Sequence, residues 1–371
     1  MALSEERAAY VTLALVPGIG PQRLTSLLAA CETASGALAA PFEFLCSIPG
    51  LSPAGATAIK AARLATGLAV LRRIDDLGAR CLLRDDPDYP SVLRSIPDPP
   101  GVLFAQGDLS LLGRPAVAVV GSRDHSAYGG EVGRTIAGAA AAAGLVIVSG
   151  MARGLDAVAQ TAALDAGGLT LGVLGNGLGV IYPAANRALY QRVQERGLLL
   201  TEFPPGDKPM AGSFPRRNRL ISGLARVTLV IEAASGSGTL ITVAMALEQG
   251  REVMVVPGNI TSPTSVGTNR LLRDGAEPLL EVADLLRHYP ELGEVAAPSG
   301  VGSAPPVAPP PPGLTPEEAA VYRALAAGPL GLDDLVARTD LPASQLLTLV
   351  TALELRGLLA PREGRLALTN Q

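Results

Sequence analysis

Five cations lie between Phe203 and Arg226, in a stretch that contains a single acid, Asp207, and so carries a charge of +4. The chain as a whole has 30 basic and 34 acidic side chains and a net charge of −4, which gives it no overall attraction for a polyanion. A local cluster of guanidinium groups therefore predicts a local anionic ligand, and phosphate suits their planar geometry. We expect one or two of the five cations to pair with acids of the protein. The five are Lys208, Arg216, Arg217, Arg219 and Arg226.

Glycines, small hydroxyls and arginines follow the apolar runs in the middle of the chain. Examples are GSRDHS at 121–126, SGMARGLD at 149–156 and EAASGSGT at 232–239. Where such a turn leads into a helix, its free amides and the helix dipole both favour a phosphate group. Phe214 adjoins the arginine cluster, and an aromatic ring beside guanidinium groups can stack an unpaired base. These residues together predict single-stranded nucleic acid as the ligand.

Residues that would carry out catalysis are few. The two histidines, His125 and His288, belong to no metal-binding or hydrolase motif, and we interpret His125 as a loop residue. Asp156 and Glu202 could form a carboxylate pair, although capping and structural roles are commoner for such acids. The run GNGLG at 175–179, with Glu202 ending the next strand, is a weak dinucleotide pattern, and no Walker A sequence is present. We predict no enzyme activity and no cofactor.

The cysteines and the apolar runs bear on the compartment. Cys31, Cys46 and Cys81 have no C-x-x-C spacing, which predicts neither a disulfide framework nor a metal site and fits a reducing cytoplasm. The first ten residues are polar and acidic, unlike an export signal. The longest uncharged run, 135–152, is Ala-rich up to Gly144 and β-branched after it, so we interpret it as helix, turn and strand. The sequence predicts a cytoplasmic protein with no membrane contact.

The elements that must position these residues form an α/β pattern over residues 77–292. Apolar runs such as PAVAVVGS, LVIVSG and LTLGVLG alternate with helical patterns, and LLLTEF, VTLVIEA and EVMVVPG continue the series. Uninterrupted apolar strands, each joined to the next by a helix, predict a parallel sheet covered on both faces. We predict an extended Rossmann-like, doubly wound sheet domain, with its ligand at the carboxyl ends of the strands.

Residues 1–76 predict a separate helical domain in front of the sheet. The turns VPGIG and IPGLS each join two helical patterns, as in helix-hairpin-helix (SAM-like) domains, whose turn amides can bind a DNA phosphate. Only Arg23 and Lys60 would support such binding. Two hairpins that simply pack on each other explain the pattern equally well.

A linker and a small third domain follow the sheet. The Pro-rich stretch 293–313 predicts a semi-extended linker. Residues 314–371 then give three helical patterns and two short strands around a turn, which predicts a winged-helix domain. Its third helix presents Gln345 and Thr348 with Arg356 as its one basic group. Protein contact or weak support of DNA binding is therefore the expected use of this domain.

Seven motifs in this order resemble the DNA processing protein A (DprA/Smf) family of bacteria, and they cover most of residues 85–278. They are DPDYPSVLRSIPDPPGVLFAQGD, VVGSRDHSAYG, VSGMARGLDAVAQTAAL, GLGVIYPAANRALY, FPRRNRLISGLA, IEAASGSGTLITVAMALEQGREVMVVPG and GTNRLLRDGA. The resemblance implies a homodimer that binds single-stranded DNA without sequence preference and protects it. It also implies loading of a RecA-type recombinase in natural transformation, and help in displacing single-strand binding protein.

The resemblance also implies a set of DNA-binding residues, carried over by position. They are Gly121, Ser122, Arg123, Ser149, Gly150, Arg153, Arg187, Lys208, Phe214, Arg217, Asn218 and Arg219. The turn SGSGT at 235–239 resembles the phosphate loop of a wider superfamily that includes nucleotide hydrolases. The alternative is therefore a nucleotide-binding or nucleotide-cleaving enzyme of that superfamily, with Glu232 as its acid.

Overall fold

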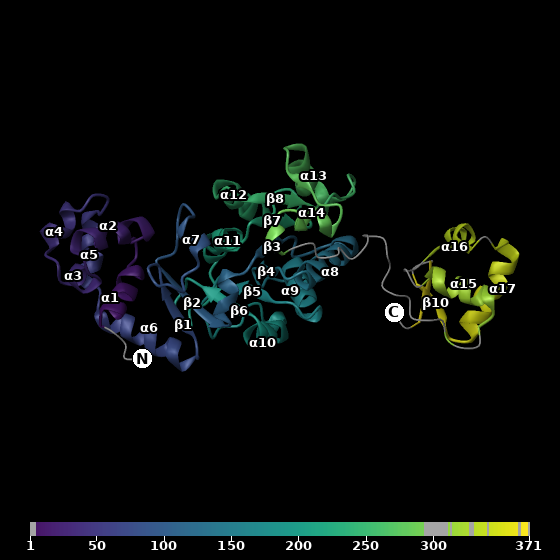
Figure 1. The fold of residues 1–371 in the computed structure, drawn as a ribbon, viewed down its shortest axis with the longest axis horizontal. Coiled ribbons are helices and arrows are strands. Elements are labelled where there is room, and N and C mark those ends of the chain that lie inside the picture. Colours follow the sequence, from purple (N-terminus) through teal and green to yellow (C-terminus); the bar gives the residue numbers. More distant parts are fainter. Residues whose placement is uncertain are drawn as a thin grey trace. The chain divides into compact units, whose positions relative to one another are not determined.

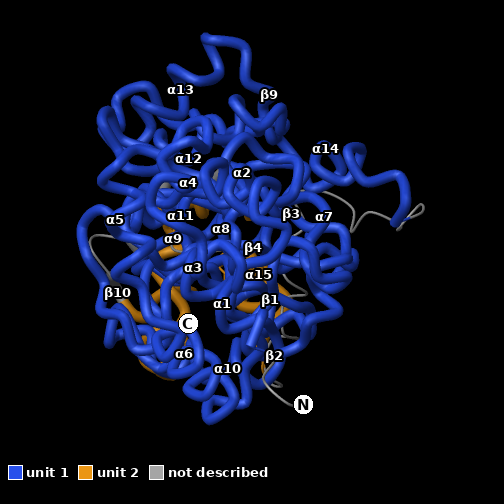
Figure 2. The backbone as a smooth tube through the Cα atoms, turned by 90° about the vertical axis from the view of Figure 1, so that its left-hand side faces the viewer, with its two compact units in different colours: residues 1–298 blue, residues 299–371 orange. Residues whose placement is uncertain are grey.

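The computed structural model describes residues 5–292, 311, 314–325, 330–339, 341–362 and 365–369. The chain forms two compact units, residues 1–298 and residues 299–371 (Figure 2). The division after Pro298 falls inside the predicted linker, 293–313, which apart from Pro311 lies outside the described residues. The predicted helical and sheet domains belong to the same unit.

Six helices form the start of the first unit, as predicted (Figure 1). Their apolar faces make a core of their own around Leu13, Leu27 and Leu45. The first and last of these helices approach closely at Gly67, where a side chain would collide with the carbonyl oxygen of Ala8. The helices are α1 (Glu5–Ala14), α2 (Pro21–Cys31), α3 (Ala34–Ala39), α4 (Phe42–Ser47), α5 (Pro53–Ala61) and α6 (Leu64–Asp76).

A nine-stranded sheet makes up the rest of the first unit, in the order β1-β2-β6-β5-β4-β3-β7-β8-β9. The strands from β3 to β9 run parallel; β2 pairs antiparallel with β6 at one edge, and β1 pairs antiparallel with β2. The strands are β1 (Arg80–Leu83), β2 (Val102–Gly107), β3 (Ala116–Val120), β4 (Val146–Ser149), β5 (Thr170–Val173), β6 (Leu198–Thr201), β7 (Val227–Val230), β8 (Glu252–Val255) and β9 (Glu277–Pro278). All six predicted strands are confirmed, and β1, β2 and β9 were not predicted.

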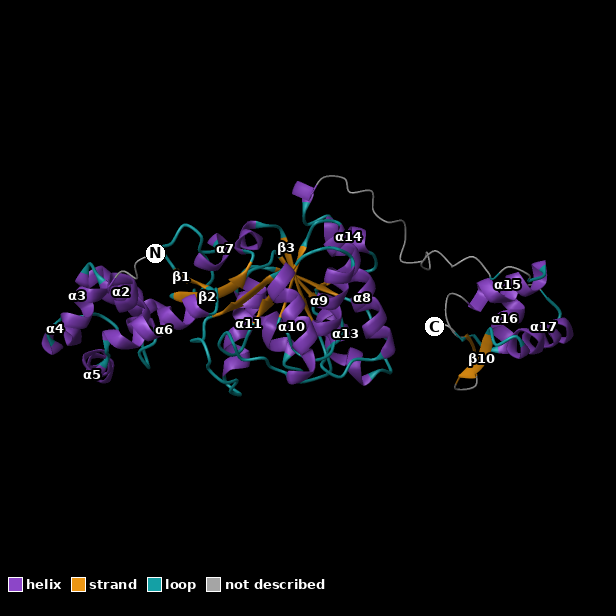
Figure 3. Cartoon of the chain, turned by 90° about the horizontal axis from the view of Figure 1, so that it is seen from below, coloured by secondary structure: helices purple, strands orange, loops and turns teal. Residues whose placement is uncertain are grey.

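Helices cover both faces of the sheet, which confirms the doubly wound prediction (Figure 3). Alternate residues of β3 enter two different cores: Val117 and Val119 pack with α8 and α9, whereas Ala118 and Val120 belong to the core that includes α11 and α12. The helices are α7 (Ser91–Arg94), α8 (Ala127–Ala142), α9 (Leu155–Asp165), α10 (Arg187–Arg196), α11 (Ser213–Gly223), α12 (Thr239–Glu248), α13 (Val266–Arg273) and α14 (Val282–Leu286). Short 3-10 turns are η1 (Leu109–Gly113), η2 (Ala184–Asn186), η3 (Pro263–Ser265) and η4 (Pro290–Leu292).

The second unit has the winged-helix pattern that the sequence predicts. Three helices pack around Val321, Leu335 and Leu353, and two antiparallel strands follow them. The elements are α15 (Pro316–Leu325), α16 (Leu332–Thr339), α17 (Ala343–Leu355), β10 (Leu359–Arg362) and β11 (Arg365–Leu368). Among the described residues of the whole chain, no single helix is long and apolar enough to cross a membrane; α5 and α6 reach that length and hydropathy only together, across a 65° bend.

An ion pair occupies the outer edge of the sheet at β1. The Arg84 N–H donates to the Gly101 carbonyl, just before β2, so the alternate residues Cys81 and Leu83 present their backbone groups to the other side. The Leu83 N–H donates to Asp86, and Arg7 of α1 donates both to Asp86, at 2.6 Å, and to the Cys81 carbonyl. Burial raises the pKa of Asp86, but the hydrogen bonds from Arg7 and Leu83 outweigh it and hold the pKa below its usual value. The pair thus ties the helical region to the sheet and blocks strand addition at this edge.

Replacing Asp86 with Asn should lower the free energy of unfolding by about 1–3 kcal/mol at pH 7, because the charge-assisted hydrogen bonds to Arg7 are lost. The pKa of Asp86 is depressed in the folded protein, so its contribution is complete above the unfolded pKa and disappears as the pH falls through the folded value. Urea denaturation across this acidic range should therefore show the variant and the wild type converging. Asp88→Asn is the control, since Asp88 and Arg80 are both about 60% exposed and 3.9 Å apart. The assignment would be contradicted if Asp88→Asn lost as much stability as Asp86→Asn. It would also be contradicted if the difference in free energy of unfolding between Asp86→Asn and the wild type did not change with pH.

Candidate nucleic-acid interface

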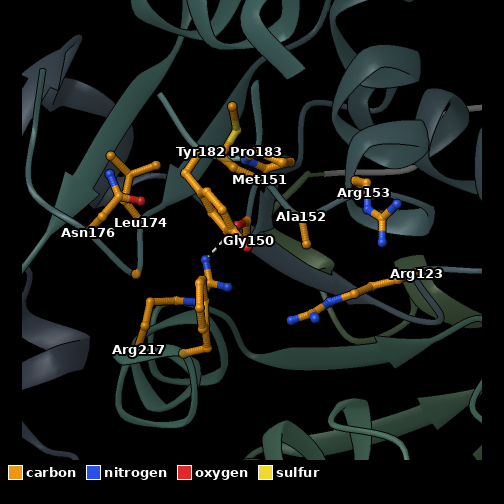
Figure 4. Close-up of a pocket in the computed structure, with 12 residues that line it drawn as sticks. Arg123, Gly150, Met151, Ala152, Arg153, Leu174, Asn176, Tyr182, Pro183 and Arg217 are labelled. Atoms are coloured by element: carbon orange, nitrogen blue, oxygen red, sulfur yellow. Dashed lines mark hydrogen bonds between the residues drawn. The ribbon is translucent and has the colours of Figure 1, made fainter. Parts of the chain in front are cut away.

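A small cleft lies at the carboxyl ends of β4 and β5, beside the loop that follows β3 and the start of α11 (Figure 4). Its volume is about 60 Å³. Pockets that enclose a whole small-molecule ligand are typically several times larger. The cleft is therefore too small to hold a complete nucleotide, and it is open to a ligand that enters only in part. Its lining residues are Arg123, Gly150, Met151, Ala152, Arg153, Leu174, Gly175, Asn176, Tyr182, Pro183, Phe214 and Arg217.

The loop between β4 and α9 forms one wall of the cleft and is held by buried polar side chains. Asp156 accepts hydrogen bonds from the N–H groups of Gly150, at 3.0 Å, and Ala152, at 3.4 Å. Gln160 accepts one from Met151, which has a positive φ of 56°. Burial raises the pKa of Asp156. The expectation that the amides of this turn bind phosphate is therefore wrong for these three groups, because they already have partners inside the protein.

Arg217 joins the ends of β4 and β5 from below the cleft. Its side chain is 4% exposed, and one terminal nitrogen donates to the carbonyls of Gly150, at 2.6 Å, and Val173. Burial lowers the pKa of Arg217 to about 10, although the nearby Asp156 carboxylate opposes the shift. The residue lines the floor of the cleft, but its main contacts are with the backbone. The main role of Arg217 is thus structural: it holds the ends of β4 and β5 together.

The exposed cations of the cleft are Arg123 and Arg153, from the loops that follow β3 and β4. Figure 4 shows the two side chains next to each other at one side of the cleft. The Arg123 guanidinium carbon lies 5.9 Å from the centre of the Phe214 ring, and the centres of the Tyr182 and Phe214 rings are 5.6 Å apart. Two guanidinium groups that form no ion pair with the described residues therefore line the same cleft as two aromatic rings.

Tyr182 and Asn176 are site residues that the sequence reasoning missed. Tyr182 is 46% exposed and reaches the cleft from the loop after β5. Asn176 is 2% exposed, and its amide nitrogen donates to the carbonyls of Gly177 and Val180. Its oxygen accepts no hydrogen bond from the described residues and lies on the side of the cleft (Figure 4). Neither residue type stands out in the sequence, and only the course of the loop brings them to Phe214.

The cluster of five cations is more fully paired than expected. Arg216 and Arg219 both contact Glu202, at 2.9 and 2.5 Å, and Arg226 contacts Glu291 at 2.7 Å. The expectation of one or two ion pairs is therefore wrong, since three of the five cations are paired. Residues 216 and 219 are three apart in α11 and so share one face, which packs against the buried Glu202.

Several predicted DNA-binding residues lie away from the cleft. Ser149 is fully buried and donates to the Val119 carbonyl, and Arg219 is 7% exposed between Glu202 and Asp98, so direct phosphate contact by either side chain is contradicted. Arg187 and Lys208 are exposed but do not line the cleft. The structure brings together Arg123, Gly150, Arg153, Phe214 and Arg217, and leaves out Gly121, Ser122, Ser149, Arg187, Lys208, Asn218 and Arg219.

The two helical hairpins use their cations internally. Arg23 donates to the carbonyls of Gly50, at 3.0 Å, and Gly18, at 2.6 Å, and so joins the two turns. Lys60 donates to the Ala40 carbonyl at 2.9 Å. Of the two explanations left open by the sequence, this geometry supports hairpins that pack on each other.

The winged-helix unit offers little positive charge on its third helix. In α17 the described side chains of Gln345, Leu347, Thr348 and Thr351 are exposed and uncharged. Arg356 contacts Glu318 at 3.1 Å. Within the described part of the chain, no group of three or more His, Cys, Asp or Glu side chains could hold a metal ion. The cleft of the first unit is therefore the better candidate for an anionic ligand.

Residues 80–290 match the family model described as DNA recombination-mediator protein A, and residues 304–365 match the DprA winged helix domain. Protein Smf of Escherichia coli is 46% identical over 205 residues, which are 55% of this chain and 55% of that relative, so the match spans about half of its length. DNA processing protein DprA of Bacillus subtilis is 40% identical over 60% of this chain and 75% of its own.

Two solved structures support the same relationship. DNA processing protein A from Streptococcus pneumoniae superposes with a TM-score of 0.66 and 33% identity, over 77% of this chain and 98% of that chain. The Helicobacter pylori protein of the same name, described for its single-stranded DNA binding mode, gives 0.52 and 32%, over 56% and 94%.

Arg217→Ala should lower the free energy of unfolding by at least about 2 kcal/mol, because it leaves the buried carbonyls of Gly150 and Val173 without their donor and each unsatisfied group costs about 1–3 kcal/mol. Arg123→Ala, at an exposed position of the same cleft, should change it by less than about 0.5 kcal/mol. Urea denaturation followed by circular dichroism compares the two variants. If Arg217→Ala and Arg123→Ala were equally stable, Arg217 would not have this structural role.

Proposed function

The chain belongs to the DNA recombination-mediator protein A (DprA/Smf) family, and on this basis we propose that it binds single-stranded DNA at the cleft between β4, β5 and α11. The bound strand would be protected and handed to a RecA-type recombinase in natural transformation and recombination. The observation that carries the binding site is the meeting of two exposed guanidinium groups, Arg123 and Arg153, with the rings of Phe214 and Tyr182.

The four side chains suit different parts of a single strand. Arg123 and Arg153 contact phosphates, which attract guanidinium groups whatever the sequence. Phe214 and Tyr182 stack an unpaired base, and stacking tolerates every base because each has a π-face. A paired base offers no free face, so the arrangement favours single strands over duplex DNA. The Asn176 oxygen, inside the cleft, can accept a hydrogen bond from an N–H group of that base.

The remaining predicted residues take lesser places in this proposal. Arg187 and Lys208 are exposed outside the cleft and would contact phosphates further along the strand. Gly121 and Ser122 lie in the loop after β3, and Asn218 lies in α11 next to Arg217. We propose that the helical domain spans residues 1–76, the sheet domain 77–292, the linker 293–313 and the winged-helix domain 314–371.

The proposed partners are a RecA-type recombinase, single-strand binding protein and a second copy of the chain, and the proposed compartment is the cytoplasm. Family membership supports both proposals.

Replacing Arg123 and Arg153 together with Ala should weaken binding to oligothymidine and flatten its salt dependence. Each phosphate contact on a single strand contributes about 0.7 to the slope of log K against log salt, so the double variant should lose about 1.4. Fluorescence anisotropy between low and moderate salt measures the slope. Arg134→Ala is the matched control, because Arg134 is an exposed arginine of α8 outside the cleft. An unchanged slope in the double variant would show that the DNA phosphates do not bind at this cleft.

Phe214→Leu should lower the affinity about five-fold or more and leave the salt slope unchanged, since stacking contributes about 1–3 kcal/mol per base but neutralises no phosphate. The same anisotropy series measures both quantities. Phe203→Leu is the control: Phe203 also lies under an arginine, Arg216 at 5.3 Å, but does not line the cleft. A change of slope in Phe214→Leu, or an equal loss in the control, would argue against stacking in the cleft.

A further inference from the structure

The position at which a doubly wound sheet usually binds a nucleotide phosphate lies beside the DNA cleft. The chain adds β4, β5 and β6 on one side of β3 and β7, β8 and β9 on the other, so the order reverses between β3 and β7. Ligands of such sheets sit at this reversal, with a phosphate at the start of the helix that follows the first strand. Here that helix is α8, sixteen residues long, which begins after its N-cap Ser126.

A carboxylate of the protein already fills this position. Glu232, two residues after the end of β7, is 2% exposed. It accepts hydrogen bonds from the Ser126 N–H at 2.9 Å, the Ser126 hydroxyl at 2.5 Å and the Thr264 hydroxyl at 3.2 Å. A side chain at Gly129, in the first turn of α8, would collide with the Glu232 carboxylate, so the glycine allows the close approach. The amide and hydroxyl of Ser126 at the start of a long helix, together with the Thr264 hydroxyl from η3, are donors that would also suit a phosphate.

We propose that Glu232 is a built-in anion that closes the nucleotide-phosphate position of this domain. The carboxylate takes the donors and the helix dipole that a mononucleotide phosphate needs, and its charge repels a second anion there. The domain consequently binds a polynucleotide at the neighbouring cleft and no free nucleotide at the reversal point. In this role Glu232 decides specificity, in place of the catalytic acid that the alternative interpretation of the sequence assigned to it.

The test is to empty the position and ask whether inorganic phosphate enters it. Glu232→Ala is made in the full chain that also carries Arg123→Ala and Arg153→Ala, so that the DNA cleft contributes no phosphate contact. The midpoint of thermal unfolding, Tm, is measured in sodium phosphate at about 20 mM and in sodium chloride of the same ionic strength. The Glu232 variant should gain about 2–4 °C in phosphate, because a ligand that binds only the folded state stabilises it.

Three controls make the outcome decisive. The parent without the Glu232 change and the variant Glu248→Ala, which removes an exposed acid of α12, should show no gain. Adding Ser126→Ala to the Glu232 variant should abolish the gain, which locates the phosphate. If Glu232→Ala does not fold, Glu232→Ser replaces it. The proposal would be overturned if a folded Glu232 variant had the same Tm in phosphate as in chloride. It would also be overturned if phosphate raised the Tm of the parent protein by as much as that of the variant. Either result leaves the DNA proposal standing, because that rests on the other cleft.

Discussion

The buried guanidinium of Arg217 fixes the shape of the region to which the exposed site residues belong. A charge inside a protein is costly unless hydrogen bonds and an opposite charge compensate it. Here the carbonyls of Gly150 and Val173 and the nearby Asp156 carboxylate do so. Because Asp156 in turn holds the amides of the β4–α9 loop, the two buried charges fix the ends of two neighbouring strands. This arrangement positions Arg153, which is on that loop, and Phe214, which is one turn before Arg217 in α11.

The site consequently separates framework cations from cations that are available to a ligand. The arginines that make the sequence look most basic, Arg216 and Arg219, balance the buried Glu202. The exposed pair, Arg123 and Arg153, lies outside this cluster, in the two Gly-rich loops that the sequence also predicts as phosphate sites. Few contacts at an open cleft would make the proposed binding dependent on salt and tolerant of sequence.

The elements with long apolar runs could be predicted from the sequence, and the short or irregular ones could not. Six strands of the sheet follow from runs such as AVAVV and LVIVS. In contrast, β1 has an apolar run of only three residues, between Arg80 and Arg84, β2 follows directly on a Pro-rich turn, and β9 has two residues. Tyr182 and Asn176 were missed for another reason: their place depends on the path of the loop after β5, which no local pattern encodes.

Helical geometry explains why the FPRRNR motif divides into two functions. Successive residues of a helix are about 100° apart, so residues three apart lie on nearly the same face. Phe214 and Arg217 share the face that meets the cleft, whereas Arg216 and Arg219 share the one that meets Glu202. Once α11 is known to begin at Ser213, the spacing alone separates the two pairs. The sequence contained this information, but it became usable only with the helix start, because Pro215 gives the motif the look of a loop before a helix.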